Sequence, residues 1–194
     1  MIKTRLALFA SGNGSNALNI IDHFVDHASI EVAFVMTNRK DAPVIVGCQN
    51  RGIECLIFTN EQVSEGQFLL DVCNSNKIDV IVLAGYLRLV PGALIGHYNG
   101  RIINIHPALL PKFGGKGMYG DNVHQAVLNG KEKETGITIH FVDEHFDEGR
   151  KIAQFYCPVS SEDSVEIIRK KVQRLEQSYF PEVIEKTILS GFHA

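Results

Sequence analysis

The chain has 194 residues, 45% of them hydrophobic, which is enough to bury the core of one domain. Its 19 lysine and arginine residues nearly balance 22 aspartate and glutamate residues, so the formal net charge is −3. These charges are interspersed and form no long basic block. The composition therefore argues against a nucleic-acid surface and favours a small-molecule substrate.

No apolar run approaches the length of a membrane span, and Met1–Arg5 leads into a strand without a signal-peptide pattern. We therefore expect a cytoplasmic protein that does not associate with membranes. The cysteines Cys48, Cys55, Cys73 and Cys157 are scattered and contain no CxxC pair. They predict buried thiols, without disulfides or a metal site.

Apolar strands and helical patterns alternate along the chain. Strands are predicted at 6–10, 30–36, 54–58, 79–84 and 101–105, with helices near 18–24, 44–50 and 61–75. This βαβα order implies a parallel sheet with helices on both faces. Strands at 137–142 and 151–156 extend the sheet in an antiparallel sense, and a helical region at 164–189 is predicted to be interrupted at Pro181 because proline lacks an amide hydrogen.

The first strand runs into a glycine turn, Ser11-Gly12-Asn13-Gly14-Ser15-Asn16, at the start of a helix. The glycines allow a tight turn, and the amides of Gly14, Ser15 and Asn16 can hold a phosphate. The turn lacks the Lys-Ser/Thr of a P-loop and the third glycine of a dinucleotide fingerprint, so ATP hydrolysis and NAD binding are poorly supported. A plain turn capped by Ser15 or Asn16 explains the pattern equally well.

Asn104 and His106 lie at the end of the strand predicted at 101–105. Because they are two residues apart, their side chains point to the same face. Pro107 and Pro111 stiffen the loop that follows. A carboxamide donor and an imidazole that titrates near neutrality suit an acyl transfer to an amine, although each residue alone is more often a turn cap or a hydrogen-bonded partner of the backbone.

An acidic turn at 143–148 follows the strand predicted at 137–142. A carboxylate from this turn can orient His106 and favour its charged form. The residues alone leave Asp143 and Asp147 as alternatives, and charged turn residues are ordinarily just solvated.

Four segments resemble, in this order, the phosphoribosylglycinamide formyltransferase family: Ser11 to Asn16, Leu83 to Arg88, Asn104 to Lys112 and Gly136 to Asp147. The Asn-x-His-Pro-x-Leu-Leu-Pro motif is specific to the wider group of folate-dependent formyltransferases. The resemblance implies one formyltransferase domain over residues 1–194. It also implies an α/β, Rossmann-like three-layer fold with a mostly parallel sheet, an antiparallel extension in the C-terminal part and helices on both faces.

The resemblance implies roles for individual residues. It assigns Asn104, His106 and Asp147 to a catalytic trio, and so favours Asp147 over Asp143. The implied contacts to the ribonucleotide substrate are Gly12, Asn13, Gly14, Ser15, Asn16, Gln173 and Glu176. The implied contacts to folate are Arg88, Leu89, Val90, Asn104, His140, Val142 and Asp147.

The implied reaction transfers the formyl group of 10-formyltetrahydrofolate, a co-substrate, to the amine of glycinamide ribonucleotide in de novo purine (IMP) biosynthesis. It passes through a tetrahedral intermediate by direct attack, because no serine or cysteine nucleophile is required. The expected partners are small molecules, without nucleic acid, membrane or metal ion. A monomer or a homodimer is expected.

One segment departs from the family pattern. Residues 113–126 are longer and richer in glycine than the corresponding Gly-x-His-x-His loop, and only His124 remains of its histidines. Gly114, Gly115 and Gly117 are expected to give a mobile lid.

Three other functions compete with this interpretation. A methionyl-tRNA formyltransferase would need a further C-terminal domain with a basic surface, and a formyltetrahydrofolate hydrolase would need an N-terminal regulatory domain; we expect this chain to be too short for either. A folate- or nucleotide-binding module without chemistry is expected to have a broken trio, whereas Asn104, His106 and Asp147 are all present.

Overall fold

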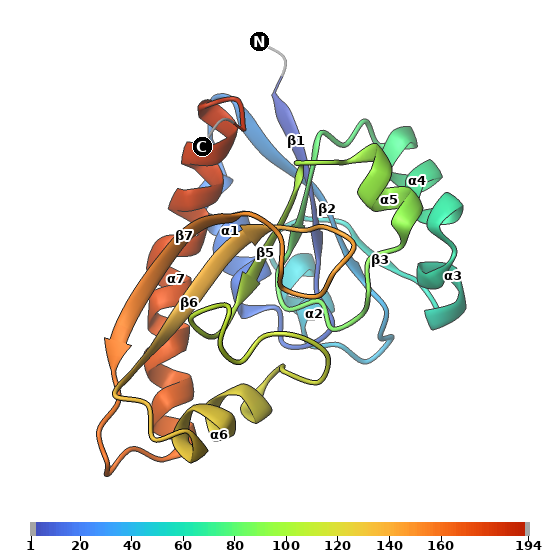
Figure 1. Cartoon of the computed structure of the whole chain (residues 1–194). Helices are drawn as coiled ribbons and strands as arrows, with labels where there is room; N and C mark the ends of the chain where they lie inside the picture. Colours follow the sequence, from blue (N-terminus) through green and yellow to red (C-terminus); the bar gives the residue numbers. More distant parts are fainter. Residues whose placement is uncertain (1–2, 193–194) are drawn as a thin grey trace. The chain divides into compact units, whose positions relative to one another are not determined.

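The computed structural model describes residues 3–192, and the chain divides into two compact units, Met1–Ile103 and Asn104–Ala194. Each unit combines strands with helices (Figure 1). Within the described residues, no helix is both long enough and apolar enough to cross a bilayer.

The first unit is built on four parallel strands, in the order β3-β2-β1-β4. They are β1 (Thr4–Phe9), β2 (Ile30–Thr37), β3 (Cys55–Ile57) and β4 (Val80–Leu83). Four consecutive residues of β1, Leu6 to Phe9, are at most 1% exposed. Because successive side chains of a strand point to opposite faces, both faces of this sheet are covered, as predicted.

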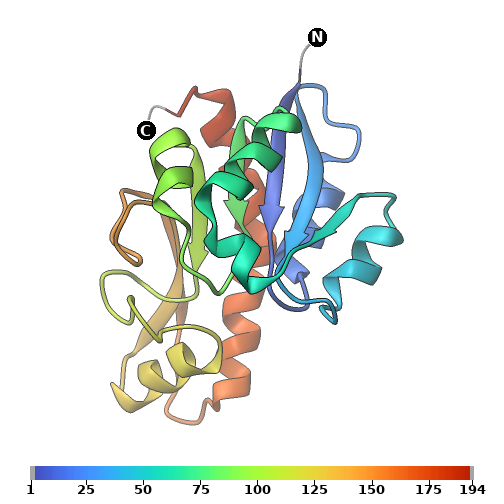
Figure 2. The same cartoon turned by 90° about the vertical axis from the view of Figure 1, so that its right-hand side faces the viewer.

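Within the described residues of the first unit, the helices are α1 (Ser15–Phe24), α2 (Val44–Gln49), α3 (Asn60–Ser64), α4 (Gly66–Ser75) and α5 (Gly92–His97). The helix predicted at 61–75 is in fact two helices, because Glu65 has an extended ψ of 94°. The sequence did not predict α5, a short helix with glycine at two of its six positions. It packs beside α4 (Figure 2).

The second unit begins within β5 (Ile102–His106) and contains α6 (Asp121–Asn129), β6 (Glu134–Phe141), β7 (Lys151–Pro158) and α7 (Val165–Leu189). The strand order is β5-β6-β7, and β6 and β7 pair antiparallel from Glu134 opposite Pro158 to His140 opposite Lys151. The predicted antiparallel extension is therefore confirmed. The helix α7 runs along β6 and β7 (Figure 1).

The interruption predicted at Pro181 is wrong, because α7 is one helix from Val165 to Leu189. A proline inside a helix costs about 3 kcal/mol or more. Around Pro181, the side chains of Phe180, Val183, Ile184 and Ile188 are all buried. Burying each such side chain contributes about 1.5–3 kcal/mol, so packing outweighs the local cost of the proline.

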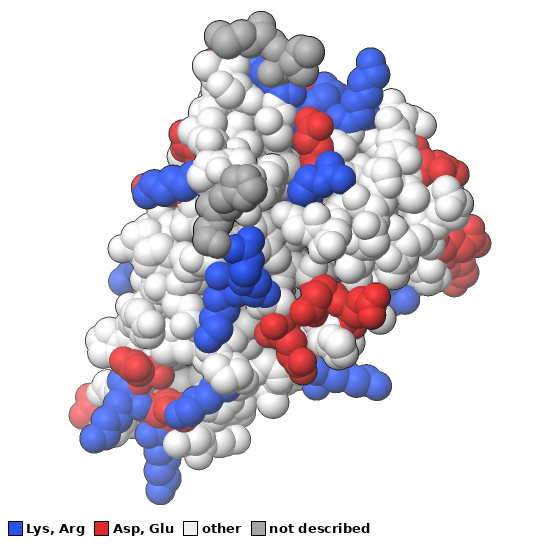
Figure 3. Space-filling model, turned by 45° about the horizontal axis from the view of Figure 1, so that its top comes forward, with Lys and Arg blue, Asp and Glu red and all other residues white. Residues whose placement is uncertain are grey.

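The parallel strands and the antiparallel β6–β7 pair confirm the predicted α/β class with a mostly parallel sheet. Basic and acidic side chains are interspersed on the face shown in Figure 3. A single domain over residues 1–194 stays a prediction.

Candidate active site

The second unit brings the three predicted catalytic side chains together. His106 is the last residue of β5, and its Nδ1 lies 3.4 Å from Asp147 Oδ2. The other carboxylate oxygen of Asp147 is 3.6 Å from His140 Nε2, which in turn is 3.1 Å from Asn104 Nδ2. Asn104, His140, Asp147 and His106 therefore form a continuous cluster.

The acidic turn aims Asp147, and not Asp143, at this cluster. Asp147 has a φ of 59°, a left-handed conformation that aspartate tolerates better than most residues. Its Oδ2 also accepts a hydrogen bond from the backbone of Gly115 at 2.9 Å. Asp143 instead accepts from the backbone of His145 at 2.8 Å and so stabilises the turn itself. The geometry thus places Asp147, the aspartate that the resemblance favours, beside His106, and keeps Asp143 within the turn.

His140 orients the carboxamide of Asn104. Its Nδ1 is 2.9 Å from the Phe141 carbonyl, and a carbonyl oxygen only accepts, so Nδ1 carries a hydrogen. In the neutral ring Nε2 then accepts from the amide of Asn104. Among residues 3–192, the second amide hydrogen of Asn104 meets no acceptor and can serve a bound group. The sequence assigned His140 to folate binding; the structure gives it 2% exposure and a position beside Asn104.

Both ring nitrogens of His106 face acceptors. Nε2 is 2.7 Å from the Phe113 carbonyl and must therefore donate to it, while Nδ1 faces Asp147. These contacts favour the doubly protonated ring. Burial acts against them and dominates, so the pKa of His106 lies below its ordinary value, although Asp147 and the Phe113 carbonyl raise it. The imidazole is thus neutral at neutral pH.

The carboxyl group of Asp147 is held in its charged form. Burial alone would raise its pKa, but the contact with His140, the charge of His106 and the Gly115 amide together outweigh burial. The pKa of Asp147 consequently lies below its ordinary value, and the group is an anion at neutral pH.

The glycine-rich segment 113–120 lies against the trio. Phe113, Gly115, Gly117 and Gly120 all have positive φ, which bends the segment back towards β5. A Cβ on Gly114 would stand 3.3 Å from Asp147 Cβ. Sequence reasoning expected only a mobile lid here and missed the backbone groups of Phe113 and Gly115 that contact His106 and Asp147.

The histidine that this segment retains lies on α6, near enough to His106 for the charge of that ring to act on it. His124 is buried on α6, and its Nδ1 has no hydrogen-bond partner within the described part of the chain. Burial lowers the pKa of His124.

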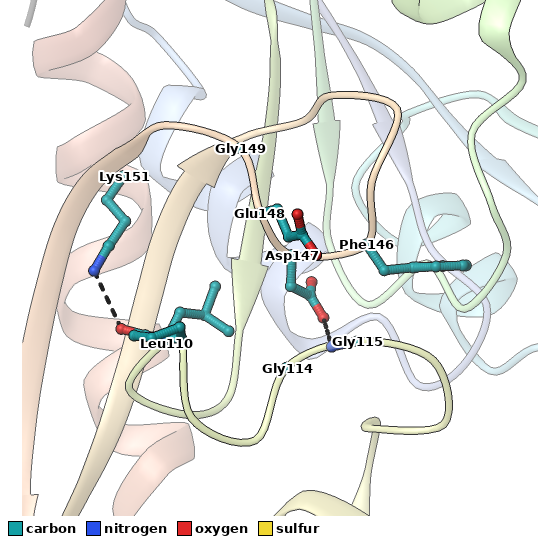
Figure 4. A pocket seen from close by; sticks show the side chains of 9 residues that line it. Leu110, Gly114, Gly115, Phe146, Asp147, Glu148, Gly149 and Lys151 are labelled. Atoms are coloured by element: carbon teal, nitrogen blue, oxygen red, sulfur yellow. Dashed lines mark hydrogen bonds between the residues drawn. The ribbon is translucent and has the colours of Figure 1, made fainter.

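A cavity of about 370 Å³ adjoins the acidic turn (Figure 4). It is lined by Leu110, Pro111, Gly114, Gly115, Phe146, Asp147, Glu148, Gly149 and Lys151. Its volume is within the range of small-molecule sites. The carboxylate of Asp147 stands at its wall and bonds to Gly115, while Lys151 Nζ donates to the Leu110 carbonyl at 3.2 Å.

Thr138 fixes the loop that follows His106. Its buried hydroxyl donates to the Ala108 carbonyl at 2.7 Å and accepts from the Leu110 amide at 3.0 Å. Gln154 donates to the same hydroxyl at 2.8 Å. Neighbouring strands thus hold both ends of the short segment 108–110, close in sequence to His106.

The predicted phosphate loop lies in the first unit. Gly14 is the N-cap of α1, with a φ of 71° and no side-chain cap, so the alternative cap at Ser15 or Asn16 is wrong. A Cβ on Gly14 would lie 2.1 Å from Val44 Cγ2, so only glycine fits. Gly12, Asn13 and Ser15 are at least partly accessible, while Asn16 is buried.

The remaining predicted contacts are spread over both units. Arg88 and Leu89 are exposed in the segment after β4, whereas Val90 is buried. Gln173 is exposed and Glu176 half-buried on α7, and Val142 is half-buried before the acidic turn. Among residues 3–192, no three His, Cys, Asp or Glu side chains come together as a possible metal site.

Comparison with known proteins agrees with this arrangement. Residues 4–184 match the family described as Formyl transferase. The chain is 34% identical to phosphoribosylglycinamide formyltransferase of Bacillus subtilis (strain 168), over 95% of this chain and 94% of the relative. It is 40% identical to the chloroplastic phosphoribosylglycinamide formyltransferase of Arabidopsis thaliana, over 94% of this chain. It spans only 64% of that protein's length, and 60% of a similar protein of Vigna unguiculata.

Solved structures share the fold over almost the whole chain. The phosphoribosylglycinamide formyltransferase of Streptococcus pneumoniae TIGR4 superposes with a TM-score of 0.85 at 31% identity, covering 97% of this chain and 99% of that one. The enzyme from Bacillus halodurans gives 0.86 at 34% identity, with 95% of each chain covered. The predicted Rossmann-like α/β fold is therefore confirmed. The family match over residues 4–184, the relatives and the shared fold all support one assignment. The chain therefore belongs to the formyl transferase family.

Proposed function

We propose that this protein transfers the formyl group of 10-formyltetrahydrofolate to the amine of glycinamide ribonucleotide, a step of de novo purine biosynthesis. The family implies a folate-derived formyl donor. The proposal rests above all on the cluster of Asn104, His106 and Asp147, and the names of the bacterial relatives support the acceptor. On this proposal, residues 1–194 act as one formyltransferase domain.

Asn104 stabilises the tetrahedral intermediate. When the amine attacks the formyl carbon, the carbonyl oxygen gains negative charge and needs a donor. One amide hydrogen of Asn104 is engaged by His140, which leaves the other aimed by a fixed carboxamide. A single preorganised donor of this kind contributes about 2.7–4 kcal/mol to transition-state stabilisation.

His106 moves the proton. Its lowered pKa keeps the ring neutral, as a base that accepts the proton of the attacking amine must be. In the structure Nε2 faces the Phe113 carbonyl and Nδ1 faces Asp147. In the reacting tautomer the single ring hydrogen lies on Nδ1 and bonds to Asp147, so Nε2 leaves the Phe113 carbonyl and accepts the proton of the amine. The imidazolium that forms donates through Nδ1 to Asp147, and then releases the proton to the departing folate nitrogen.

Separate segments bind the substrates. The backbone amides of Gly14 to Asn16 bind the phosphate, with Gly12 and Asn13 beside them, and Gln173 and Glu176 contact the ribonucleotide. Folate is bound by the segment Arg88 to Val90 and by His140 and Val142 beside the trio. No metal ion takes part. We further infer a cytoplasmic monomer or homodimer that acts on small molecules.

One assay tests the proposal against its alternatives. The assay follows the change in absorbance when 10-formyltetrahydrofolate, or its dideaza analogue, loses the formyl group. We expect this change with glycinamide ribonucleotide as acceptor. Release of formate without an acceptor would indicate a hydrolase, and formylation of Met-tRNA would indicate the tRNA enzyme. Binding of both ligands without any turnover would indicate a non-catalytic module.

A further inference from the structure

Ser11 is the residue immediately before the phosphate loop, and it is tied twice to the segment after β4. Its backbone amide donates to the Gly85 carbonyl at 3.0 Å. Its hydroxyl accepts from the Leu87 amide at 3.2 Å and donates to Asn38 Oδ1 at 2.8 Å. The residue is only 3% exposed. A hydroxyl that donates in one direction and accepts in another has a fixed orientation.

The acceptor of this hydroxyl, Asn38, directly follows a third strand, β2. Its Nδ2 donates to Asn60 Oδ1 at 2.9 Å, at the first residue of α3. The carboxyl ends of β1, β2 and β4 are thus joined through one side chain. Ser11 cannot turn away from Leu87 without losing Asn38 as well.

Tyr86 and Val90 are buried and anchor the two ends of the segment tied by Ser11. Gly85 turns the chain sharply, with a φ of 80°. The side chains of Leu87 and Leu89 are 56% and 55% exposed, so burial does not hold them in place. The backbone bond from Leu87 to Ser11 therefore sets the path of the chain into Arg88, Leu89 and Val90.

We propose that Ser11 is a positioning residue that sets the folate-binding segment, residues 88–90, against the phosphate loop, residues 12–16. This inference rests on the function proposed above. Formyl transfer requires the amine and the formyl carbon to approach to about 3–3.5 Å, and a misplacement of about 1 Å can cost about a hundredfold in rate. Ser11 fixes the position of the folate-binding segment relative to the phosphate loop, and these two segments hold the two reactants.

The test is Ser11→Ala, assayed at varied concentrations of each substrate. One neutral hydrogen bond corresponds to about a two- to twelvefold change in an equilibrium, so we expect the folate KM to rise about three- to tenfold. We expect kcat to fall about tenfold or more, because the donor is no longer held in register. The calorimetric Kd of the ribonucleotide should stay within about twofold, because the backbone bond from Ser11 to Gly85 remains.

Three further variants serve as a rescue, a partial disruption and a control. Ser11→Thr keeps a hydroxyl and should restore most of kcat. Asn38→Ala removes the acceptor but leaves the bond to Leu87, so it should change the same parameters less. Ser64→Ala removes a hydroxyl on α3 that donates to two backbone carbonyls of its own helix, and should leave all parameters unchanged.

Unchanged folate KM and kcat in Ser11→Ala would overturn the inference, as would equal weakening of both ligands. If Ser11→Ala does not fold, Asn38→Ala decides the question by the same contrast between folate and ribonucleotide. If the wild-type protein binds both ligands but transfers no formyl group, the proposed function fails. Calorimetry on the same variants then still shows whether Ser11 acts selectively on folate.

Discussion

Asp147 illustrates at the scale of one residue how a charge is positioned for chemistry. Its left-handed backbone brings the carboxylate between two histidines and the Gly115 amide. The same carboxylate raises the pKa of His106 against the stronger effect of burial. Asp147 therefore influences the pKa of His106 as well as contacting its ring.

Asp147→Asn should show this influence. Without the negative charge the imidazolium is less stable, so the pKa of His106 falls further. The base must be neutral to act, and the acidic limb of the pH–rate profile should therefore move to lower pH while the maximal rate falls. Profiles of wild type and variant over a common pH range provide the comparison. An unmoved limb with an undiminished rate would make Asp147 a solvated turn residue.

His106→Ala should remove turnover and leave ribonucleotide binding intact. The imidazole acts on the transferring proton, and a general base contributes about 10²–10⁴-fold. Steady-state kinetics and calorimetry on the ribonucleotide measure the two effects separately. His97→Ala, an exposed histidine on α5, is the matched control. A rate within a few-fold of wild type would exclude His106 as the proton carrier.

At the scale of elements, the glycine-rich segment 113–120 bonds directly to two residues of the proposed catalytic trio. Two of its backbone groups, the Phe113 carbonyl and the Gly115 amide, bond to His106 and Asp147. His106 and Asp147 are thus held by a segment that lies outside β5 and the acidic turn. Movement of this segment necessarily changes the environment of both groups.

Gly114→Ala tests that coupling. The new Cβ would lie 2.6 Å from Leu110 Cδ2 and 3.3 Å from Asp147 Cβ, so the segment or the aspartate must shift. We expect kcat to fall at least tenfold, because about 1 Å of misplacement costs up to about a hundredfold, with little change in thermal stability. Gly96→Ala on α5, where the new Cβ meets nothing within 4 Å, should leave kcat unchanged. Equal kcat for the two variants would argue against the coupling.

At the scale of the whole molecule, buried histidines make folding depend on pH. Burial lowers the pKa of His106 and of His124 below the ordinary value of 6.5. Below that value the unfolded chain binds protons that the folded chain excludes. Stability should therefore be complete above about pH 6.5 and decline as the pH falls towards the lowered values.

Urea denaturation between pH 5 and 8 would measure this dependence, with the pH range set by the ordinary histidine pKa of about 6.5. We expect the midpoint to fall on acidification in the wild-type protein, and to fall less in His106→Gln and His124→Gln. A His23→Gln variant, which changes an exposed histidine on α1, should follow the wild type. A flat wild-type profile would show that the burial of these rings does not control stability.

Much of the fold could be predicted from local pattern. The strands β1, β2 and β4 were found because buried parallel strands are continuous apolar runs, as in Leu6 to Phe9. The glycine-containing α5 was missed, and α7 was wrongly divided at Pro181. In both cases packing in the folded chain outweighs weak helix propensity.

The sequence by itself determined the α/β class, the pairing of Asn104 and His106 on one strand face, and the glycine turn before α1. These depend on strand periodicity, on apolar content and on the backbone freedom of glycine, all of which are local. Only the tertiary structure placed Asp147 beside His106 while Asp143 bonds within its own turn, placed His140 beside Asn104 across 36 positions of sequence, and joined Ser11 to Leu87 across 76. Contacts at such separations depend on how strands are brought side by side, and no local pattern encodes that distance.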